Sequence, residues 1–82
     1  MKIRPVEPHI LRRIKKWRLE KKWTKATCLF VSNPKHPSLN LELLEPKHRG
    51  IYSFRLDKKY RALFFIDGGE IEIFQVTSHY KK

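Results

Sequence analysis

The sequence has little of what secreted and membrane proteins depend on. Its 82 residues include one cysteine, Cys28, so no disulfide can form within the chain and a reducing compartment fits it best. No apolar run approaches the roughly 18 residues that span a bilayer, and no apolar segment follows the first charges as it would in a signal peptide. We therefore expect a cytoplasmic protein with no membrane association.

Acidic residues are also scarce. The chain carries 19 Lys and Arg against 8 Asp and Glu, a formal net charge of +11. A hydrophobic content of 40% and an aromatic content of 12% exclude a disordered basic tail, and the length allows one folded domain, residues 1–82. Because such a charge opposes compaction, we expect a polyanionic partner, either nucleic acid or an acidic protein.

The positive charge is concentrated in the first half of the chain. Residues 1–38 hold 11 Lys and Arg and 2 Glu, a net charge of +9, which leaves +2 for residues 39–82. A solvated helix surface is the simpler interpretation, but the near-uniform sign favours a surface that binds a polyanion. The candidate RNA-binding residues are Arg12, Arg13, Lys15, Lys16, Arg18, Lys21, Lys22 and Lys25.

Hydrophobic spacing predicts two helices and then a run of strands. Ile10, Ile14 and Trp17 share one helical face, which predicts a helix from about Pro8 to about Glu20. Residues 24–33 suit either a strand or a short second helix, and we choose the helix. Strands are predicted at Tyr52–Leu56, Tyr60–Ile66 and Ile71–Val76, with further short ones at Leu39–Leu44 and Lys2–Arg4. Asp67-Gly68-Gly69 predicts a hairpin turn.

This order predicts an α+β fold in which a short N-terminal strand and two helices pack on one face of a mainly antiparallel sheet. The loop after Leu56 decides which residues share a face. A three-residue loop gives the helices an apolar face and places Ser53, Arg55 and Arg61 together on the other, whereas a two-residue loop separates the two arginines. We prefer the three-residue loop. On the open face the arginines would bind an anion or, alternatively, be solvated or paired with Glu72.

Several segments together resemble the RelE/ParE toxin superfamily of toxin–antitoxin modules, and most closely its YoeB- and YafQ-like branches. They are Asn33-Pro34-Lys35-His36-Pro37-Ser38-Leu39, the strand ending in Phe54-Arg55-Leu56, Lys59-Tyr60-Arg61-Ala62-Leu63-Phe64, Glu70-Ile71-Glu72-Ile73-Phe74, and Thr77-Ser78-His79-Tyr80. The likeness covers about Ile10 to Tyr80, and it rests on the order and spacing of short motifs.

The resemblance implies a RelE-like toxin that acts as a metal-independent endoribonuclease. It would cut mRNA in the ribosomal A site, inhibit translation without a cofactor, and form a hetero-oligomer with an acidic antitoxin. Arg61 matches the arginine that holds the scissile phosphate and Arg55 a basic position before it. His79 matches the histidine that acts as acid or base, Tyr80 the aromatic residue beside it, and His36 a YafQ-like histidine. His36-Pro37-Ser38 stands where the YoeB-like pattern has a glutamate, so the identity of the general base stays open.

Other chemistry has less support. The four histidines, at positions 9, 36, 48 and 79, have no metal-ligand spacing, so no metal site is expected. Cys28 lies in an apolar stretch and is expected to be an inert core thiol. A regular strand after Gly68-Gly69 would place His79 on the face of Phe64, so a catalytic His79 requires the chain to leave the regular strand. The alternatives to an RNA-cleaving toxin are a ParE-like gyrase inhibitor and a small non-enzymatic RNA-binding protein.

Overall fold

Residues 1–78 of the computed structural model are described here, and they form an α+β fold. Within this range the sheet has five strands in the order β1-β5-β4-β3-β2. Only β1 runs parallel to its neighbour, β5, and the other pairs are antiparallel. The strands are β1 (Lys2–Ile3), β2 (Glu42–Leu43), β3 (Ile51–Arg55), β4 (Arg61–Asp67) and β5 (Glu70–Thr77). The predicted fold class is confirmed.

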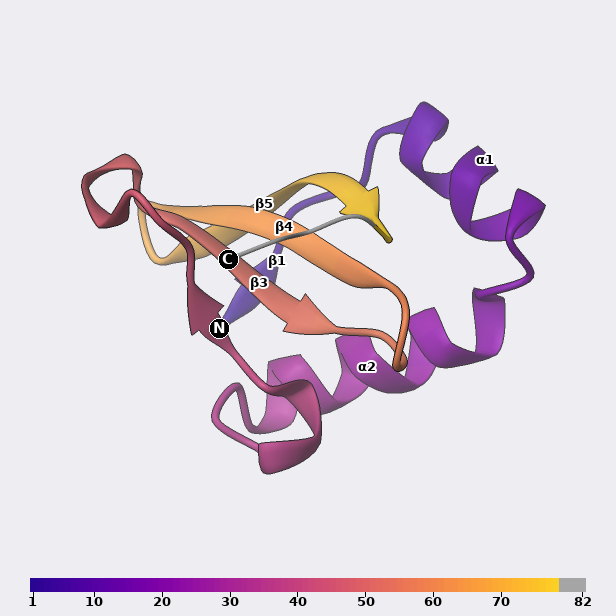
Figure 1. Ribbon diagram of the computed structural model, residues 1–82, viewed down its shortest axis with the longest axis horizontal. Helices are drawn as coiled ribbons and strands as arrows, with labels where there is room; N and C mark the ends of the chain where they lie inside the picture. Colours follow the sequence, from indigo (N-terminus) through magenta and orange to yellow (C-terminus); the bar gives the residue numbers. More distant parts are fainter. Residues whose placement is uncertain (79–82) are drawn as a thin grey trace.

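The two helices supply one side of the core. Helix α1 (Pro8–Lys16) lies beside the end of β5, and α2 (Glu20–Ser32) runs along the lower side of the sheet (Figure 1). Ile10 and Ile14 of α1 are buried as predicted. Phe30 of α2 stacks on Phe54 at 5.2 Å and meets Phe64 edge-on at 5.3 Å, so three aromatic rings join the helix to β3 and β4.

The predicted helix from Pro8 to Glu20 is wrong at its C-terminal end, because the chain turns after Lys16. Arg18 has φ +55°, its N–H donates to Lys15 O at 3.1 Å, and the N–H of Leu19 donates to Ile14 O at 2.9 Å. This is a Schellman motif, in which a left-handed residue ends the helix and the next residue packs on the last turn. Leu19 is buried, so burial of its side chain supports the left-handed Arg18.

The second helix therefore starts earlier than predicted, at Glu20 and not near Thr24, and residues 24–32 are helical, not extended. Cys28 on this helix is exposed, so the expectation of a core thiol is wrong. The segment Leu39–Leu44 is also less regular than predicted. A single 3-10 turn, η1 (Pro37–Leu39), precedes the two-residue β2, and a second, η2 (Lys47–Arg49), precedes β3.

Strand register confirms the preferred loop. Arg55 is the Cα partner of Arg61, and the N–H of Leu56 donates to Tyr60 O at 2.9 Å, which leaves three residues between them. Of the predicted apolar face, Phe54, Leu56, Ala62 and Phe64 are buried and Tyr52 is half-buried. Ile66 is 43% exposed, which contradicts the prediction because the helices do not cover this end of β4.

The last strand contains a β-bulge. Leu63 is the partner of Gln75 but Phe64 is the partner of Ile73, so Phe74 has no Cα partner on β4. One extra residue reverses the alternation of side chains beyond it. Ile71, Ile73 and Val76 can therefore all be buried, and Thr77 lies opposite Arg61 and not on the face of Phe64. The bulge therefore interrupts the regular alternation that was assumed for His79, which itself lies outside the described residues.

Between β4 and β5 the turn is as predicted. Gly68 and Gly69 have φ +62° and +79°, and Asp67 is the partner of Glu70. Two consecutive positive φ angles define the type I′ turn, whose twist suits a hairpin and which glycine adopts without strain. Arg4, just after β1, holds this turn through contacts of its guanidinium group with Asp67 and Glu70 at 3.2 and 3.1 Å. It also contacts Glu72 at 3.5 Å. Glu72 therefore pairs with Arg4, contrary to the alternative in which it pairs with Arg55 and Arg61.

Candidate active site

Arg55 and Arg61 lie in one cavity on the face of the sheet that the helices leave open. The cavity has a volume of about 690 Å³. We call it the arginine cavity, and define it by its lining residues, which are Asn40, Arg55, Asp57, Lys58, Lys59, Arg61, Thr77 and Ser78. Four of these side chains are basic and one is acidic, so the cavity attracts anions.

The guanidinium group of Arg61 is oriented by two hydrogen bonds. Its Nε donates to Ser53 Oγ at 2.9 Å and its Nη2 donates to the carbonyl oxygen of Asn40 at 2.7 Å. Ser53 is fully buried, and Asn40 adopts a left-handed conformation with φ +45° after η1. Both acceptors are neutral, so these two hydrogen bonds orient the guanidinium group without adding a negative charge. Arginine suits phosphate because its planar fork can bind two oxygens at once.

Arg55 comes from the facing strand. Its Nε donates to the carbonyl oxygen of Asp57 at 3.2 Å, which ties it to the turn between β3 and β4. Like charges at directly opposed positions of an antiparallel pair are destabilising. An anion that contacts both guanidinium groups would reduce this repulsion.

Asp57 is the acidic residue of the cavity, and its carboxylate is fully engaged. Oδ2 accepts from Lys22 Nζ at 2.8 Å, and Oδ1 accepts from the backbone N–H groups of Lys59 and Tyr60, both at 2.8 Å. Partial burial raises the pKa of Asp57, but these hydrogen bonds outweigh it and hold the pKa below its ordinary value. A carboxylate with a lowered pKa is a weak base, so Asp57 has a structural role in shaping the turn.

We expect Asp57→Asn to lower the free energy of unfolding by about 1–2 kcal/mol at pH 7. Because the folded pKa is lowered, the carboxylate stabilises the protein above its unfolded pKa, and this stabilisation is lost as the pH falls through the folded pKa. The difference between variant and wild type should therefore shrink below about pH 4. Denaturant unfolding at pH 7 and at pH 3 measures it. Glu7→Gln, at an exposed carboxylate, is the control, and equal stability of Asp57→Asn and wild type at pH 7 would contradict this role.

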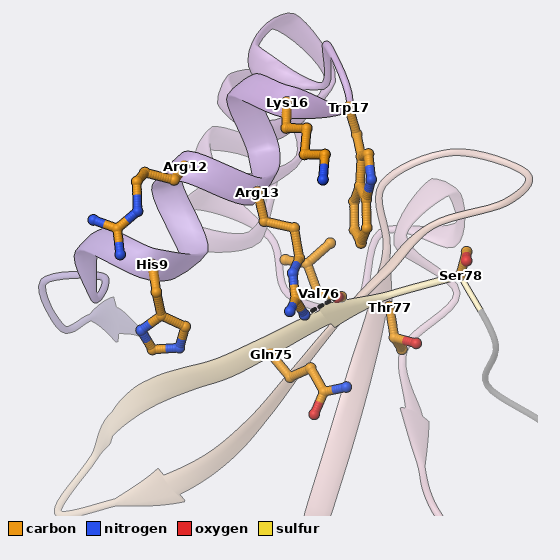
Figure 2. A pocket seen from close by; sticks show the side chains of 9 residues that line it. All are labelled: His9, Arg12, Arg13, Lys16, Trp17, Gln75, Val76, Thr77 and Ser78. Carbon is orange, nitrogen blue, oxygen red and sulfur yellow. Dashed lines mark hydrogen bonds between the residues drawn. The ribbon is translucent and has the colours of Figure 1, made fainter.

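The predicted RNA-binding residues do not form one surface. Arg12, Arg13 and Lys16 line a second depression of about 540 Å³ between α1 and the end of β5. We call it the α1 cleft, and its other lining residues are His9, Trp17, Gln75, Val76, Thr77 and Ser78. Figure 2 shows Arg13 directed from α1 toward Val76, with Lys16 and Trp17 beside it. The two depressions share Thr77 and Ser78.

The remaining basic residues of the predicted set lie elsewhere. Lys22 and Lys25 border a smaller pocket of about 270 Å³ between α2 and β3, which Arg55 also lines. Lys15, Arg18 and Lys21 are exposed and border neither the α1 cleft nor the arginine cavity. The turn after Lys16 separates the run into two helices, so one basic stretch of sequence faces several directions.

Two of the predicted catalytic residues lie outside the described part of the chain, and a third lies away from the cavity. His79 and Tyr80 follow Ser78 and are not among residues 1–78. His36 precedes η1, and its Nδ1 accepts a hydrogen bond from the N–H of Ser38 at 3.1 Å. It caps that turn and does not line the arginine cavity. The strand that leads to His79 does reach the cavity, at Thr77 and Ser78.

Sequence reasoning missed the turn lysines, Lys58 and Lys59, and the carbonyl oxygen of Asn40, which accepts from Arg61. The lysines could have been found, because the three-residue loop already placed them beside both arginines. The carbonyl of Asn40 could not, since a backbone acceptor has no residue-type signal. In residues 1–78, no three His, Cys, Asp or Glu side chains are grouped as a metal site would require, and no helix has the length and hydropathy of a membrane span.

The sequence and the fold can be compared with those of known proteins. No protein-family model matches the chain. A segment of 43 residues, 52% of this chain, is 40% identical to an uncharacterized protein of Haemophilus influenzae, and the match spans 43% of that protein. That likeness covers too little of either chain to assign a family.

Solved structures give a likeness over nearly the whole chain. The YoeB/ParE toxin from Agrobacterium tumefaciens matches with a TM-score of 0.72 at 19% identity, over 98% of this chain and 100% of that one. The chain has the RelE/ParE-like toxin fold. A chain of the heterotetrameric YoeB–YefM toxin–antitoxin complex from Staphylococcus aureus shares this toxin fold, with a TM-score of 0.69 at 21% identity and coverage of 98% of both chains.

The toxin fold also extends to more distant sequences. A chain of the Escherichia coli DinJ–YafQ toxin–antitoxin complex matches with a TM-score of 0.72 at 9% identity, over 95% of this chain and 89% of that one. At these identities the likeness is one of architecture. It confirms the RelE-like fold expected from the sequence, and the chemistry of this chain has to be argued from its own residues.

Proposed function

We propose that the protein is the toxin of a type II toxin–antitoxin module and that it inhibits translation by cleaving mRNA on the ribosome. The observation that carries this proposal is the arginine cavity, in which two guanidinium groups from paired strand positions face the end of β5. Structures with the same fold, among them YoeB and YafQ, occur in toxin–antitoxin complexes, and this supports the module. A ribosomal target makes the cytoplasm the site of action.

The chemistry follows from what RNA itself supplies. A base removes the proton of a 2′-OH, O2′ forms a bond to the adjacent phosphorus, and the bond from phosphorus to O5′ breaks as an acid protonates O5′. The products are a 2′,3′-cyclic phosphate and a 5′-OH. No water is needed as nucleophile, because the attacking oxygen belongs to the substrate.

Phosphate binding, proton transfer and base stacking are assigned to different residues. Arg61 binds the scissile phosphate and stabilises the negative charge that develops on its oxygens, with Arg55 as the second donor. His79 transfers protons, because an imidazole with an ordinary pKa near 6.5 can act as both base and acid near neutral pH. Tyr80 supplies an aromatic ring for base stacking. His36 is a further candidate for proton transfer, and it would have to move from its position at η1 to take part.

The proposed protein partner is an acidic antitoxin with which the chain forms a hetero-oligomer. The net charge of +11 and the basic side chains that line the arginine cavity are complementary to such a partner. The basic residues of α1 and α2 that border neither the arginine cavity nor the α1 cleft are proposed to contact ribosomal RNA. There the phosphate backbone provides affinity independent of sequence.

We expect cleavage on ribosomes to depend on the 2′-OH of the nucleotide 5′ to the cut. Programmed ribosomes would be incubated with the protein and an mRNA that carries a single 2′-deoxy nucleotide at the cut position. The unmodified mRNA should yield 2′,3′-cyclic phosphate and 5′-OH ends, and the 2′-deoxy mRNA should stay intact there. The same mRNA without ribosomes is the control for ribosome dependence.

Other outcomes would contradict the proposal in defined ways. Cleavage of the 2′-deoxy mRNA with 5′-phosphate ends would mean that water is the nucleophile. If mRNA stays intact and cleaved DNA accumulates in complex with gyrase, the protein is a gyrase inhibitor and not an RNA-cleaving toxin.

A further inference from the structure

The α1 cleft adjoins the arginine cavity but is a separate depression. Thr77 and Ser78 line both, so the end of β5 forms a wall that the two have in common. The cleft opens between α1 and the end of β5 (Figure 2), and neither of the paired arginines lines it. A ligand that crosses the end of β5 would therefore contact both depressions.

The chemistry of the cleft is that of an anion site. Its lining residues in the described part of the chain include three basic side chains, Arg12, Arg13 and Lys16, and no carboxylate. His9 adds an imidazole, and Gln75, Thr77 and Ser78 add neutral hydrogen-bonding groups suited to a sugar hydroxyl. By contrast, the arginine cavity contains Asp57.

Arg13 is held in place before any ligand arrives. Its Nη1 makes a long hydrogen bond of 3.5 Å to the carbonyl oxygen of Val76, and its guanidinium carbon lies 5.5 Å from the centre of the Trp17 ring. Trp17 in turn stacks on Tyr60 at 4.9 Å, and Tyr60 directly precedes Arg61. Because Arg13 is already ordered, less conformational entropy is lost when it binds a phosphate.

The role of Trp17 also limits what the cleft can recognise. Its ring already contacts Tyr60 and the guanidinium group of Arg13, so it acts as a support for Arg13 more than as a surface for a base. The other lining groups are donors to phosphate and ribose. Such a site contributes affinity without sequence preference.

We propose that the α1 cleft binds a backbone phosphate of the same RNA strand whose scissile phosphate lies in the arginine cavity. This inference rests on the proposed function, because it takes RNA as the substrate. It adds a second contact point that fixes how the strand crosses the end of β5. The strand then enters over α1 and reaches the paired arginines past Thr77 and Ser78.

The test compares two variants that lose the same charge. Arg12→Gln/Arg13→Gln/Lys16→Gln removes the cations of the cleft, and Lys35→Gln/Lys47→Gln/Arg49→Gln removes three exposed cations elsewhere. The probe is a fluorescent RNA hexanucleotide with a 2′-deoxy residue at the cut position, so that it binds without being cut. Its affinity is measured by anisotropy over a range of salt concentrations. Thermal melting checks that both variants are folded.

We expect the cleft variant to bind the hexanucleotide about tenfold or more weakly. The slope of log affinity against log salt concentration should fall by about 0.7 for each phosphate that the protein no longer neutralises. The control variant should keep most of the wild-type affinity. The loss of affinity in the cleft variant should be the same for hexanucleotides of different sequence. Arg13→Lys keeps the charge but removes the planar fork, and it should give an intermediate affinity.

The outcomes separate this inference from the proposed function. Equal affinities and slopes for the cleft variant and the control would overturn the cleft as an RNA site, even if ribosome-bound mRNA is still cut. Loss of affinity for an acidic peptide with unchanged RNA binding would assign the cleft to a protein partner and also overturn it. A third outcome is that the wild type binds the hexanucleotide, the cleft variant binds it more weakly, and the wild type does not cleave mRNA. This result would support the cleft as an RNA site and contradict the proposed nuclease activity.

Discussion

Arg61→Ala is expected to reduce cleavage of ribosome-bound mRNA about 10²–10³-fold, the cost of removing one preorganised donor from a developing negative charge. The expectation follows from the two hydrogen bonds to neutral acceptors that orient this guanidinium group in the cavity. Single-turnover cleavage rates on programmed ribosomes measure it. The loss should be in the rate of the chemical step, because the contact strengthens as charge builds up on the phosphate.

Two further variants show whether orientation or charge matters. Ser53→Ala removes the acceptor at 2.9 Å but leaves Arg61 charged, and it should lower the rate by about tenfold. Arg61→Lys keeps a charge without the fork and should resemble Arg61→Ala. Because Arg61 also bonds the carbonyl of Asn40, melting temperatures should accompany the rates. Wild-type cleavage by folded Arg61→Ala would remove this residue from the mechanism.

His79→Ala is expected to lower the cleavage rate about 10²–10⁴-fold, the usual contribution of general acid–base catalysis. His79 follows Thr77 and Ser78, which line the arginine cavity, and the bulge at Phe74 is what places Thr77 opposite Arg61. The pH–rate profile provides a second readout. The wild type should show a limb near the ordinary pKa of histidine, about 6.5, and the variant should lose that limb.

His48→Ala is the matched control, because His48 is an exposed histidine of η2 outside the cavity. It should keep both the wild-type rate and the wild-type pH profile. If His79→Ala retains the wild-type profile while Arg61→Ala is inactive, proton transfer belongs to another residue. His36→Ala is then the next variant to measure. Its cleavage rate should fall by more than the loss of the hydrogen bond that caps η1 would explain.

Much of the sheet was predictable because its pattern is local. Alternation from Tyr52 to Leu56 and from Ala62 to Phe64 separates an apolar face from a polar one. Because burying an unpaired charge is costly, the three-residue loop that keeps both arginines on the polar face is favoured over the two-residue loop. Gly68-Gly69 predicts the last hairpin from local sequence too, because the turn needs two positive φ angles and few residues other than glycine tolerate them. The shared face of Arg55 and Arg61 follows from these two constraints.

Other features depend on contacts that no local pattern contains. The end of α1 is set by a left-handed arginine, Arg18, where the common signal would be glycine, and burial of Leu19 supports it. The bulge did leave a trace, because Gln75 stands where regular alternation requires an apolar residue and Val76 where it requires a polar one. The exposure of Cys28 could not be predicted, since an apolar neighbourhood in sequence does not determine which face of α2 packs inward.

The candidate site was predictable to a similar degree. The residue types of Arg55 and Arg61 indicate phosphate chemistry, and their register follows from the strands. The α1 cleft was not predictable, because its walls are α1 and the end of β5, which are distant in sequence. The basic run from Arg12 to Lys25 indicated an anion surface but could not show that a turn at Arg18 divides it.

The bulge at Phe74 has a consequence for how this strand can change in length during evolution. If Phe74 were deleted, Ile73 and Gln75 would become neighbours and the strand would alternate regularly from Ile71 to Thr77. The pairings of Ile73 with Phe64 and of Thr77 with Arg61 would both be kept. Relatives one residue shorter here could thus present the same residues to the cavity, without the stacking of Phe65 on Phe74. An alignment gap in this strand would therefore be compatible with an unchanged active site.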